Sequence, residues 1–150
     1  MNVIEEIDPK YYEQDYRNPV YIFHGSRVLV PVLKAHQAVC KGGHDINNKN
    51  AVYGSSMFIG AIPYAFKNIL NHCAIGSGPD DLTMKIYDGV IPEDDYGYVY
   101  VCDAKTFRNP REDCQFFSEE DVVPIAVIKV YYRDYKECFV YVEDNYPREM

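Results

Sequence analysis

Two short segments of this chain end an apolar run with a ring-bearing side chain, a glycine and a serine. His24, Gly25 and Ser26 close the first run, and Tyr53 is followed by a glycine and by Ser55 in the second. Glycine lacks a Cβ, so the backbone there can turn and approach a ligand closely. An imidazole, an aromatic ring and an open backbone suit a flat polar ligand such as a nucleotide. A strand that ends in Gly-Ser is also an ordinary turn, and the residues alone favour that structural interpretation.

Other common kinds of site lack their sequence patterns. The histidines are far apart and share no ligand spacing with cysteines or acids, so we expect no metal site. The chain has no Gly-x-Ser-x-Gly nucleophile elbow and neither of the usual glycine-rich phosphate loops. Composition alone leaves a cysteine–histidine nucleophile open, without a local motif to support it.

The acidic balance of the chain bears on its partners. The 15 Lys and Arg residues face 23 Asp and Glu residues, which gives a net charge of -8. Such a surface repels nucleic acid and anionic membranes unless a local basic patch opposes it, and here the basic residues are spread singly. No apolar run approaches the length of a membrane span. We therefore expect neither a nucleic-acid partner nor a membrane partner.

The cysteines and the first residues bear on the compartment. The five cysteines are odd in number and irregularly spaced, without a Cys-x-x-Cys pair, which favours free buried thiols in a reducing environment. Met1–Lys10 carries three acidic residues and lacks the apolar stretch of a signal peptide. These features predict a cytoplasmic protein.

The order of apolar runs and turn signals predicts many short strands and one substantial helix, an α+β fold built on antiparallel sheets. Ser55 or Ser56 offers an N-cap for a helix over Met57–Leu70, which Pro63 should kink or divide. Val28–Ala38 is an apolar stretch that we expect to wrap the sheet. The expected strands are Val20–His24, Asn50–Tyr53, Leu82–Tyr87, Tyr98–Cys102, Gln115–Phe117, Ile125–Val130 and Phe139–Val142, with a helical turn capped by Asp103 and loops over Cys40–Asn50 and Gly76–Pro79.

The two opening segments also resemble a known superfamily. Phe23-His24-Gly25-Ser26, and then Val52-Tyr53-Gly54-Ser55 leading into a helix, resemble the first two signatures of ADP-ribosyltransferases. The match is to the diphtheria-toxin and poly(ADP-ribose) polymerase class, whose triad is His-Tyr-Glu. The carboxyl half is similar to small bacterial proteins of unassigned function that share this fold. Its matching segments are Tyr98–Val101, Phe107, Phe116–Ser118, Val122–Pro124 and Ile125–Ile128, so that the resemblance covers roughly Val20 to Val142 in order.

The resemblance implies a fold, a cofactor and residue roles. The implied fold is a split antiparallel β-sandwich of the ADP-ribosyltransferase type, with one main helix after the second strand. The implied cofactor is NAD, bound with His24 on the adenosine-side ribose and the backbone of Gly25 on the nicotinamide carboxamide. Tyr53 would stack on the nicotinamide ring, and Ser26 and Ser55 would support the pocket by hydrogen bonds.

The third triad position departs from the family. Gln115 stands where the family has its catalytic glutamate, and the nearby Glu112 and Glu119 fit the register less well. Cleavage of the nicotinamide bond passes through an oxocarbenium-like state, which a carboxylate stabilises. Glutamine keeps a hydrogen-bond acceptor and loses the charge, and loss of one such contact commonly costs ~10²–10³ in rate. Gln115 and His24 are the catalytic candidates. Three outcomes are open: another group replaces the missing carboxylate, the enzyme is slow, or the pocket binds its ligand without turnover.

Several hypotheses therefore stay open. The leading one is an NAD-dependent ADP-ribosyltransferase of unknown acceptor, with residues 1–19 as a lead-in segment and residues 20–150 as a single domain. The second is a catalytically impaired module on the same fold that binds a nucleotide or a protein. An RNA 2'-phosphotransferase shares this fold, but the acidic charge counts against it. A purely structural protein is also open.

Overall fold

The computed structural model describes residues 3–4, 6, 8–37, 50–66, 73–75, 84–86, 90–109 and 113–141. The predicted loops over 40–49 and 76–79 lie outside these residues, as do positions 67–70 of the predicted helix. His44, His72 and Glu112 also lie outside them. The described residues form a mixed α+β structure dominated by one sheet, which confirms the predicted class.

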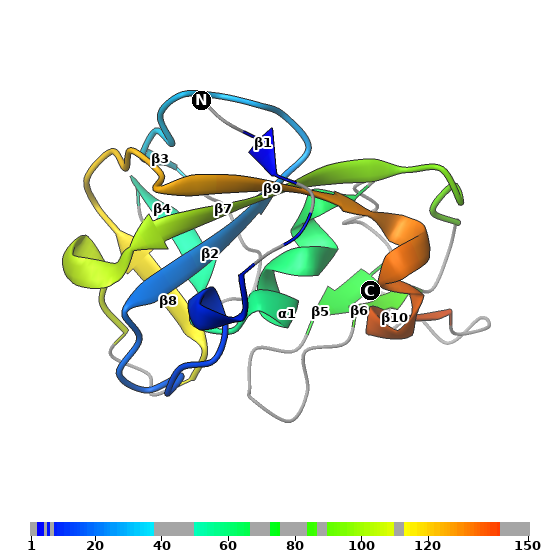
Figure 1. The fold of residues 1–150 in the computed structure, drawn as a ribbon, viewed down its shortest axis with the longest axis horizontal. Helices are drawn as coiled ribbons and strands as arrows, with labels where there is room; N and C mark the ends of the chain where they lie inside the picture. Colours follow the sequence, from blue (N-terminus) through cyan, green and yellow to red (C-terminus); the bar gives the residue numbers. More distant parts are fainter. Residues whose placement is uncertain are drawn as a thin grey trace, which may run out of the picture.

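The main sheet has seven strands in the order β1-β9-β7-β2-β4-β3, with β8 paired to β4 (Figure 1). Antiparallel ladders join β2 to β7 and β7 to β9. The pairing of β1 with β9 is parallel, so the prediction of a fold built on antiparallel sheets is wrong at this edge. The strands are β1 (Val3–Ile4), β2 (Tyr21–Ser26), β3 (His36–Gln37), β4 (Asn50–Ser55), β7 (Tyr96–Asp103), β8 (Gln115–Ser118) and β9 (Ala126–Tyr131).

Both faces of the central strands are covered by apolar packing. Neighbouring residues of a strand point to opposite faces, so Phe23 enters one core cluster and Ile22 enters the other. In β7, Val99 and Val101 join the cluster of Phe23, whereas Tyr100 joins the cluster of Ile22. Strands that are buried on both faces are continuously apolar, which is why the sequence reveals them as runs.

The segment Val28–Ala38 does wrap the sheet, as predicted, along its described residues 28–37. Leu33 forms an isolated antiparallel bridge with Val122, with both N···O distances at 2.8 Å. The hydroxyl of buried Tyr100 donates to the carbonyl of Val28 and accepts from the amide of Val30, at 2.7 and 2.8 Å. These bonds fix the segment over the cluster that contains Ile22.

The helical segment on the opposite face is divided, as predicted, and within the described residues it ends at Ala65. Helix α1 covers Phe58–Ala61, and the 3₁₀ helix η3 covers Ile62–Ala65 (Figure 1). The change of helix type occurs beside Pro63, as expected for a residue that cannot donate a backbone hydrogen bond. The predicted serine N-cap is wrong, because Met57 holds the N-cap position and no side chain caps it.

A second, three-stranded sheet has the order β10-β6-β5, and its β10–β6 pairing is parallel. Its strands are β5 (Cys73–Ile75), β6 (Met84–Ile86) and β10 (Phe139–Tyr141). Between β9 and β10 lie the 3₁₀ helices η6 (Tyr132–Asp134) and η7 (Lys136–Cys138). The hydroxyls of Tyr132 and Tyr141 are 2.7 Å apart, which ties η6 to this sheet.

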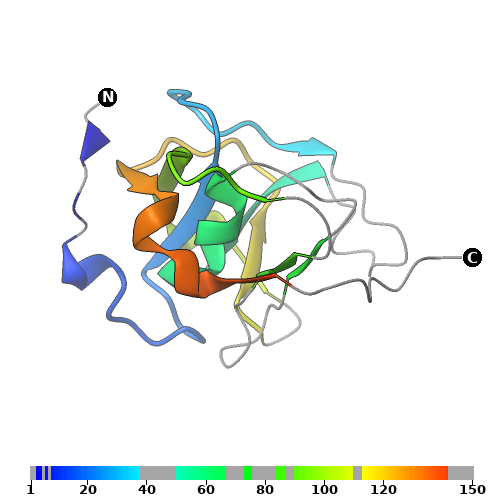
Figure 2. The ribbon, with the colours of Figure 1, turned by 90° about the vertical axis from the view of Figure 1, so that its right-hand side faces the viewer.

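The N-terminal segment lies along one side of the molecule (Figure 2, dark blue). It contains β1 and the 3₁₀ helix η1 (Pro9–Tyr11). The Gln14 amide nitrogen donates to the carbonyls of Tyr21 and Ser56, at 2.8 and 2.9 Å. Its oxygen accepts from the amides of Val20 and Tyr21, both at 3.0 Å. We call this four-bond attachment the Gln14 clamp.

A short 3₁₀ helix, η5 (Ala104–Thr106), follows β7 where the sequence predicts a helical turn. The Asp103 side chain accepts a hydrogen bond from the amide of Lys105 at 2.9 Å. The predicted cap at Asp103 is therefore confirmed. Bridging of Arg108 to Phe117 then leads the chain back alongside β8.

Candidate functional site

The two predicted motifs meet where β2 and β4 adjoin. Along the described lengths of these strands, one Cα pair, Phe23 with Ser55, joins them in the ladder. One residue beyond that pair, the His24 Nδ1 atom lies 2.5 Å from the carbonyl oxygen of Tyr53. We call this junction the seam. The fold thus brings side by side two motifs that the sequence places almost thirty residues apart.

The imidazole at the seam has a defined orientation. A carbonyl oxygen can only accept, so Nδ1 of His24 carries the proton in this bond. The His24 ring is half-buried, and its centroid lies 6.2 Å from that of buried Tyr100. Tyr100 is hydrogen-bonded to the segment that wraps the sheet, of which we call residues 28–35 the covering segment. The environment of the histidine is therefore fixed both by the Tyr53 carbonyl and by Tyr100. Burial raises the pKa of the Tyr100 hydroxyl, which keeps that hydroxyl a neutral donor.

Tyr53 and Gln115 share one face of the sheet. The β4–β8 register pairs Tyr53 with Phe117 and Ser55 with Gln115, and directly paired residues point to the same side. The Tyr53 and Phe117 rings lie 6.4 Å apart at 43°. Gln115 is half-buried, and its backbone amide donates to Asp113 Oδ1 at 2.9 Å. The structure therefore makes Tyr53 and Gln115 diagonal neighbours on one face of the β4–β8 ladder.

The His24 side chain lies on the opposite face of the sheet from Tyr53 and Gln115. Phe23 pairs with Ser55, so both side chains point to the face of the sheet that carries Tyr53. Neighbouring residues of a strand point to opposite faces, so His24 points to the other face. The contact of His24 with Tyr53 is made to the backbone, not to the ring. A ligand that touches all three candidate side chains must therefore cross the seam between β2 and β4.

The two motif glycines have packing roles. A Cβ on Gly25 would lie 2.1 Å from the carbonyl oxygen of Ala61, and one on Gly54 would lie 2.5 Å from Ile22 Cγ2. A third glycine, Gly97, would bring a Cβ to 1.6 Å from the carbonyl oxygen of Ala65. The helical segment and β2 thus occupy the space that the sequence suggested for a ligand.

The serines of the motifs accept local hydrogen bonds. Ser26 Oγ accepts from the amide of Val28 at 3.2 Å, and Ser55 Oγ accepts from the amide of Met57 at 3.0 Å. Ser56 is buried beside Cys114, where burial raises the pKa of the thiol and the serine hydroxyl partly offsets that rise. Two of these serines therefore fix the backbone that follows each motif.

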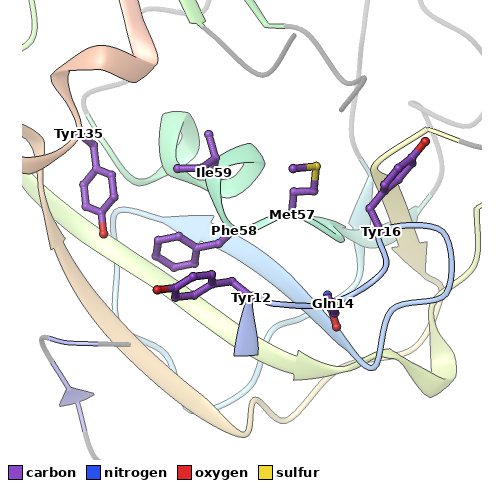
Figure 3. Close-up of a pocket in the computed structure, with 7 residues that line it drawn as sticks. All are labelled: Tyr12, Gln14, Tyr16, Met57, Phe58, Ile59 and Tyr135. Carbon is purple, nitrogen blue, oxygen red and sulfur yellow. The ribbon is translucent and has the colours of Figure 1, made fainter. Parts of the chain in front are cut away.

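A separate apolar hollow lies on the helical face of the sheet (Figure 3). It encloses about 420 Å³, and none of the predicted site residues lines it. Figure 3 shows Tyr135 and Tyr16 at its two ends, with α1 residues on one side and residues of the N-terminal segment on the other. We call this hollow the aromatic slot. Its lining residues are Tyr12, Gln14, Tyr16, Met57, Phe58, Ile59 and Tyr135.

Sequence reasoning missed two residues that organise these sites, Gln14 and Tyr100. Gln14 lies in a polar segment without periodicity, and only the fold shows that its amide joins two strand ends. Tyr100 belongs to a run of alternating Tyr and Val, which predicts a strand but not the two hydrogen bonds of its hydroxyl. The signal that could have identified Tyr100 is its place in an apolar run, because a tyrosine that is buried in a strand needs a hydrogen-bond partner for its hydroxyl.

Comparisons with known proteins leave the family open. No protein-family model, curated protein or solved structure matches this chain. Among the described residues, no group of three His, Cys, Asp or Glu side chains is placed to hold a metal ion. Within the same residues, every helix is too short or too polar to cross a membrane.

Proposed function

We propose that this protein binds NAD at the seam between β2 and β4 and is an ADP-ribosyltransferase-like protein of the cytoplasm. Under this proposal the main sheet and the smaller sheet form the split β-sandwich of that superfamily. The reaction is transfer of ADP-ribose from NAD to an acceptor, or cleavage of the nicotinamide–ribose bond. The acceptor is unknown.

The observation that carries the proposal is the meeting of the two motifs. His24 Nδ1 and the Tyr53 carbonyl oxygen are 2.5 Å apart, next to the Cα pair of Phe23 and Ser55. A shared binding site requires that the two motifs adjoin in space, and they do. A seam between strands, with an imidazole on one side and an aromatic ring on the other, suits an elongated ligand with a flat ring.

Each candidate residue has a role in the proposed complex. His24 contacts the adenosine-side ribose, and its bond to the Tyr53 carbonyl fixes the ring for that contact. Tyr53 stacks on the nicotinamide ring. The carboxamide meets the backbone of Gly25 at the strand edge beyond the Phe23–Ser55 pair, because Ala61 fills the side-chain face of this glycine. Ser26 and Ser55 hold the backbone at the motif ends through their bonds to the amides of residues 28 and 57.

A second candidate function rests on Gln115. This residue lies opposite Ser55 in the β4–β8 ladder, close to Tyr53, at the position where a catalytic carboxylate is expected. An uncharged amide stabilises an oxocarbenium-like state poorly. The alternative is therefore a module that binds NAD or an ADP-ribose-like nucleotide, or a protein in its place, without turnover.

The first test is calorimetric titration with NAD, with nicotinamide release measured on the same sample. We expect saturable binding that Tyr53→Ala weakens about tenfold, because each base-sized ring stacked on an aromatic residue contributes about 1–3 kcal/mol. Tyr53→Phe keeps the ring and is the matched control, with affinity close to that of the unaltered chain. Equal NAD affinity in all three proteins would show that Tyr53 does not stack on the cofactor.

Nicotinamide release separates the two candidate functions. If the pocket lacks only its carboxylate, Gln115→Glu should raise the release rate about 10²–10³-fold. The double variant His24→Ala with Gln115→Glu should lose that gain, because the ribose contact is removed. Binding of NAD without release in Gln115→Glu would favour the module that only binds.

A further inference from the structure

The aromatic slot is lined by side chains from three separate segments of the chain. Tyr12 and Tyr16 come from the N-terminal segment, Phe58 from α1 and Tyr135 from the link between η6 and η7. The Phe58 ring centroid lies 6.0 Å from that of Tyr12 and 6.1 Å from that of Tyr135. Three rings thus stand in a row beside the hollow (Figure 3).

The Gln14 clamp gives the slot its shape before any ligand arrives. Its four hydrogen bonds use both protons and the oxygen of the amide, so the N-terminal segment is held against β2 and Ser56. Tyr12 and Tyr16 flank this anchor and are thereby kept opposite α1. Phe58 itself packs edge-on against Phe23 at 5.6 Å, which fixes the floor of the slot to the core.

The electrostatics around the slot favour a positive ligand. The faces of aromatic rings carry partial negative charge, which attracts cations within about 6 Å of the ring centroid. Burial and then the charge of Asp134 raise the pKa of Tyr135, and Glu137 makes the last and smallest contribution, so carboxylates lie near this end of the slot. At the other end, the Arg17 guanidinium already occupies the Tyr16 ring, 5.4 Å from its centroid, so a positive ligand is favoured at the end of the slot near Tyr135.

We propose that the aromatic slot is a binding site for a small organic cation of the quaternary-ammonium class. Methylated ammonium groups are weakly hydrated, and rings replace their water at little cost. An inorganic cation would miss the oxygen ligands it prefers, because the lining is apolar apart from hydroxyls and a fully bonded amide. The volume of about 420 Å³ leaves room for a tail beyond the headgroup.

The test compares choline with 3,3-dimethylbutan-1-ol, which has the same shape without the charge. Calorimetry or nuclear magnetic resonance titration should show choline binding with a Kd on the order of 1 mM, at least about tenfold tighter than the neutral probe. Tyr12→Leu and Tyr135→Leu should each weaken choline binding several-fold. Tyr12→Phe keeps the ring and should preserve it, as should Tyr64→Leu, an exposed tyrosine outside the slot.

Two further arms complete the experiment. A trimethyllysine peptide that binds more than tenfold tighter than choline would assign the cation to a modified protein, and a lesser peptide affinity assigns it to a free small molecule. Equal binding of choline and its neutral analogue, or choline binding unchanged by both leucine variants, would overturn the proposal. NAD affinity should be unchanged in Tyr12→Leu. The proposal of a cation site in the aromatic slot and the proposal of an NAD site at the seam are therefore tested independently.

Discussion

At the scale of single residues, glycine determines how closely the helical segment approaches the sheet. Gly25 and Gly97 lie on β2 and β7, opposite the carbonyl oxygens of Ala61 and Ala65. A methyl group at either position would overlap backbone atoms that cannot move without displacing α1 and η3. The sheet and the helical segment therefore fit together only because both positions lack a side chain.

Gly97→Ala should destabilise the fold by about 3 kcal/mol, at the upper end of what overpacking costs, because its Cβ would be 1.6 Å from a backbone oxygen. Val90→Ala is the control, since this side chain is 69% exposed and its loss should change stability by less than about 0.5 kcal/mol. Urea unfolding followed by circular dichroism measures both. Similar unfolding midpoints would mean that the helical segment is not held against β7.

The same glycines show what the sequence could predict about the site. The freedom of Gly25 and its place after His24 are visible in the sequence, but the sequence does not say what uses the space. In the structure the carbonyl of Ala61 lies there. The meeting of His24 with Tyr53 follows from β2 lying beside β4, a topology that periodicity does not encode. The residue types offered one reason to group these two residues, and the resemblance to a family gave each of them a specific role.

At the scale of elements, the covering segment 28–35 is held at both ends by hydrogen bonds. Tyr100 binds its beginning, and Asp121 Oδ1 accepts from the amide of Ala35 at 2.8 Å near its end. Lys34 adds an exposed ion pair to Asp121 at 3.4 Å. The backbone hydrogen bond from Ala35 lowers the pKa of Asp121 below its ordinary value of 3.8, burial opposes this shift, and the hydrogen bond and charge of Lys34 add to the lowering.

Because the folded pKa of Asp121 is depressed, its carboxylate stabilises the fold above the ordinary pKa, and this stability is lost as the pH falls through the folded pKa. Asp121→Ala should therefore lower the urea midpoint at pH 7, and the difference from the unaltered chain should shrink at pH values near 3. Asp94→Ala, at another exposed acidic residue, serves as the control. A difference that is the same at both pH values would exclude this carboxylate as its source.

Element prediction succeeded where local chemistry decides the structure. The strands around Phe23, Tyr100 and Ile128 follow from apolar runs, and the cap at Asp103 follows from its hydrogen-bonding side chain. It failed where tertiary contacts decide. Val3–Ile4 is a strand only because β9 offers an open edge, and Ser55 bonds to the amide of Met57 ahead of the helix rather than capping it.

At the scale of the whole molecule, both main core clusters contain a buried thiol group that can lose a proton. Cys102 lies in the cluster on one face of the main sheet and Cys138 in the cluster on the other, and both thiols are free and buried. Burial raises the pKa of Cys102 to about 12. Burial, and then the nearby charge of Glu137, raises that of Cys138 to about 11.

These thiols should make the fold sensitive to alkali. Between the ordinary thiol pKa of 9.0 and the raised folded value, the unfolded chain loses protons that the folded chain keeps, so stability falls as the pH rises. The urea midpoint should therefore decline from about pH 9 upward. Cys102→Ala should make this decline shallower, whatever its effect at neutral pH. An unchanged slope in that variant would locate the titrating groups elsewhere.

The order of strands has a consequence for synthesis of the chain on the ribosome. The central ladder pairs Tyr21 with Asp103, so β2 emerges roughly 80 residues before the strand that covers its edge. At roughly 5–20 residues per second, β2 waits for about 4–16 s with an unpaired apolar edge. During this time the nascent protein is prone to aggregate through the unpaired edge of β2. Its yield in cells should therefore depend on chaperones that shield β2 until β7 has been synthesised.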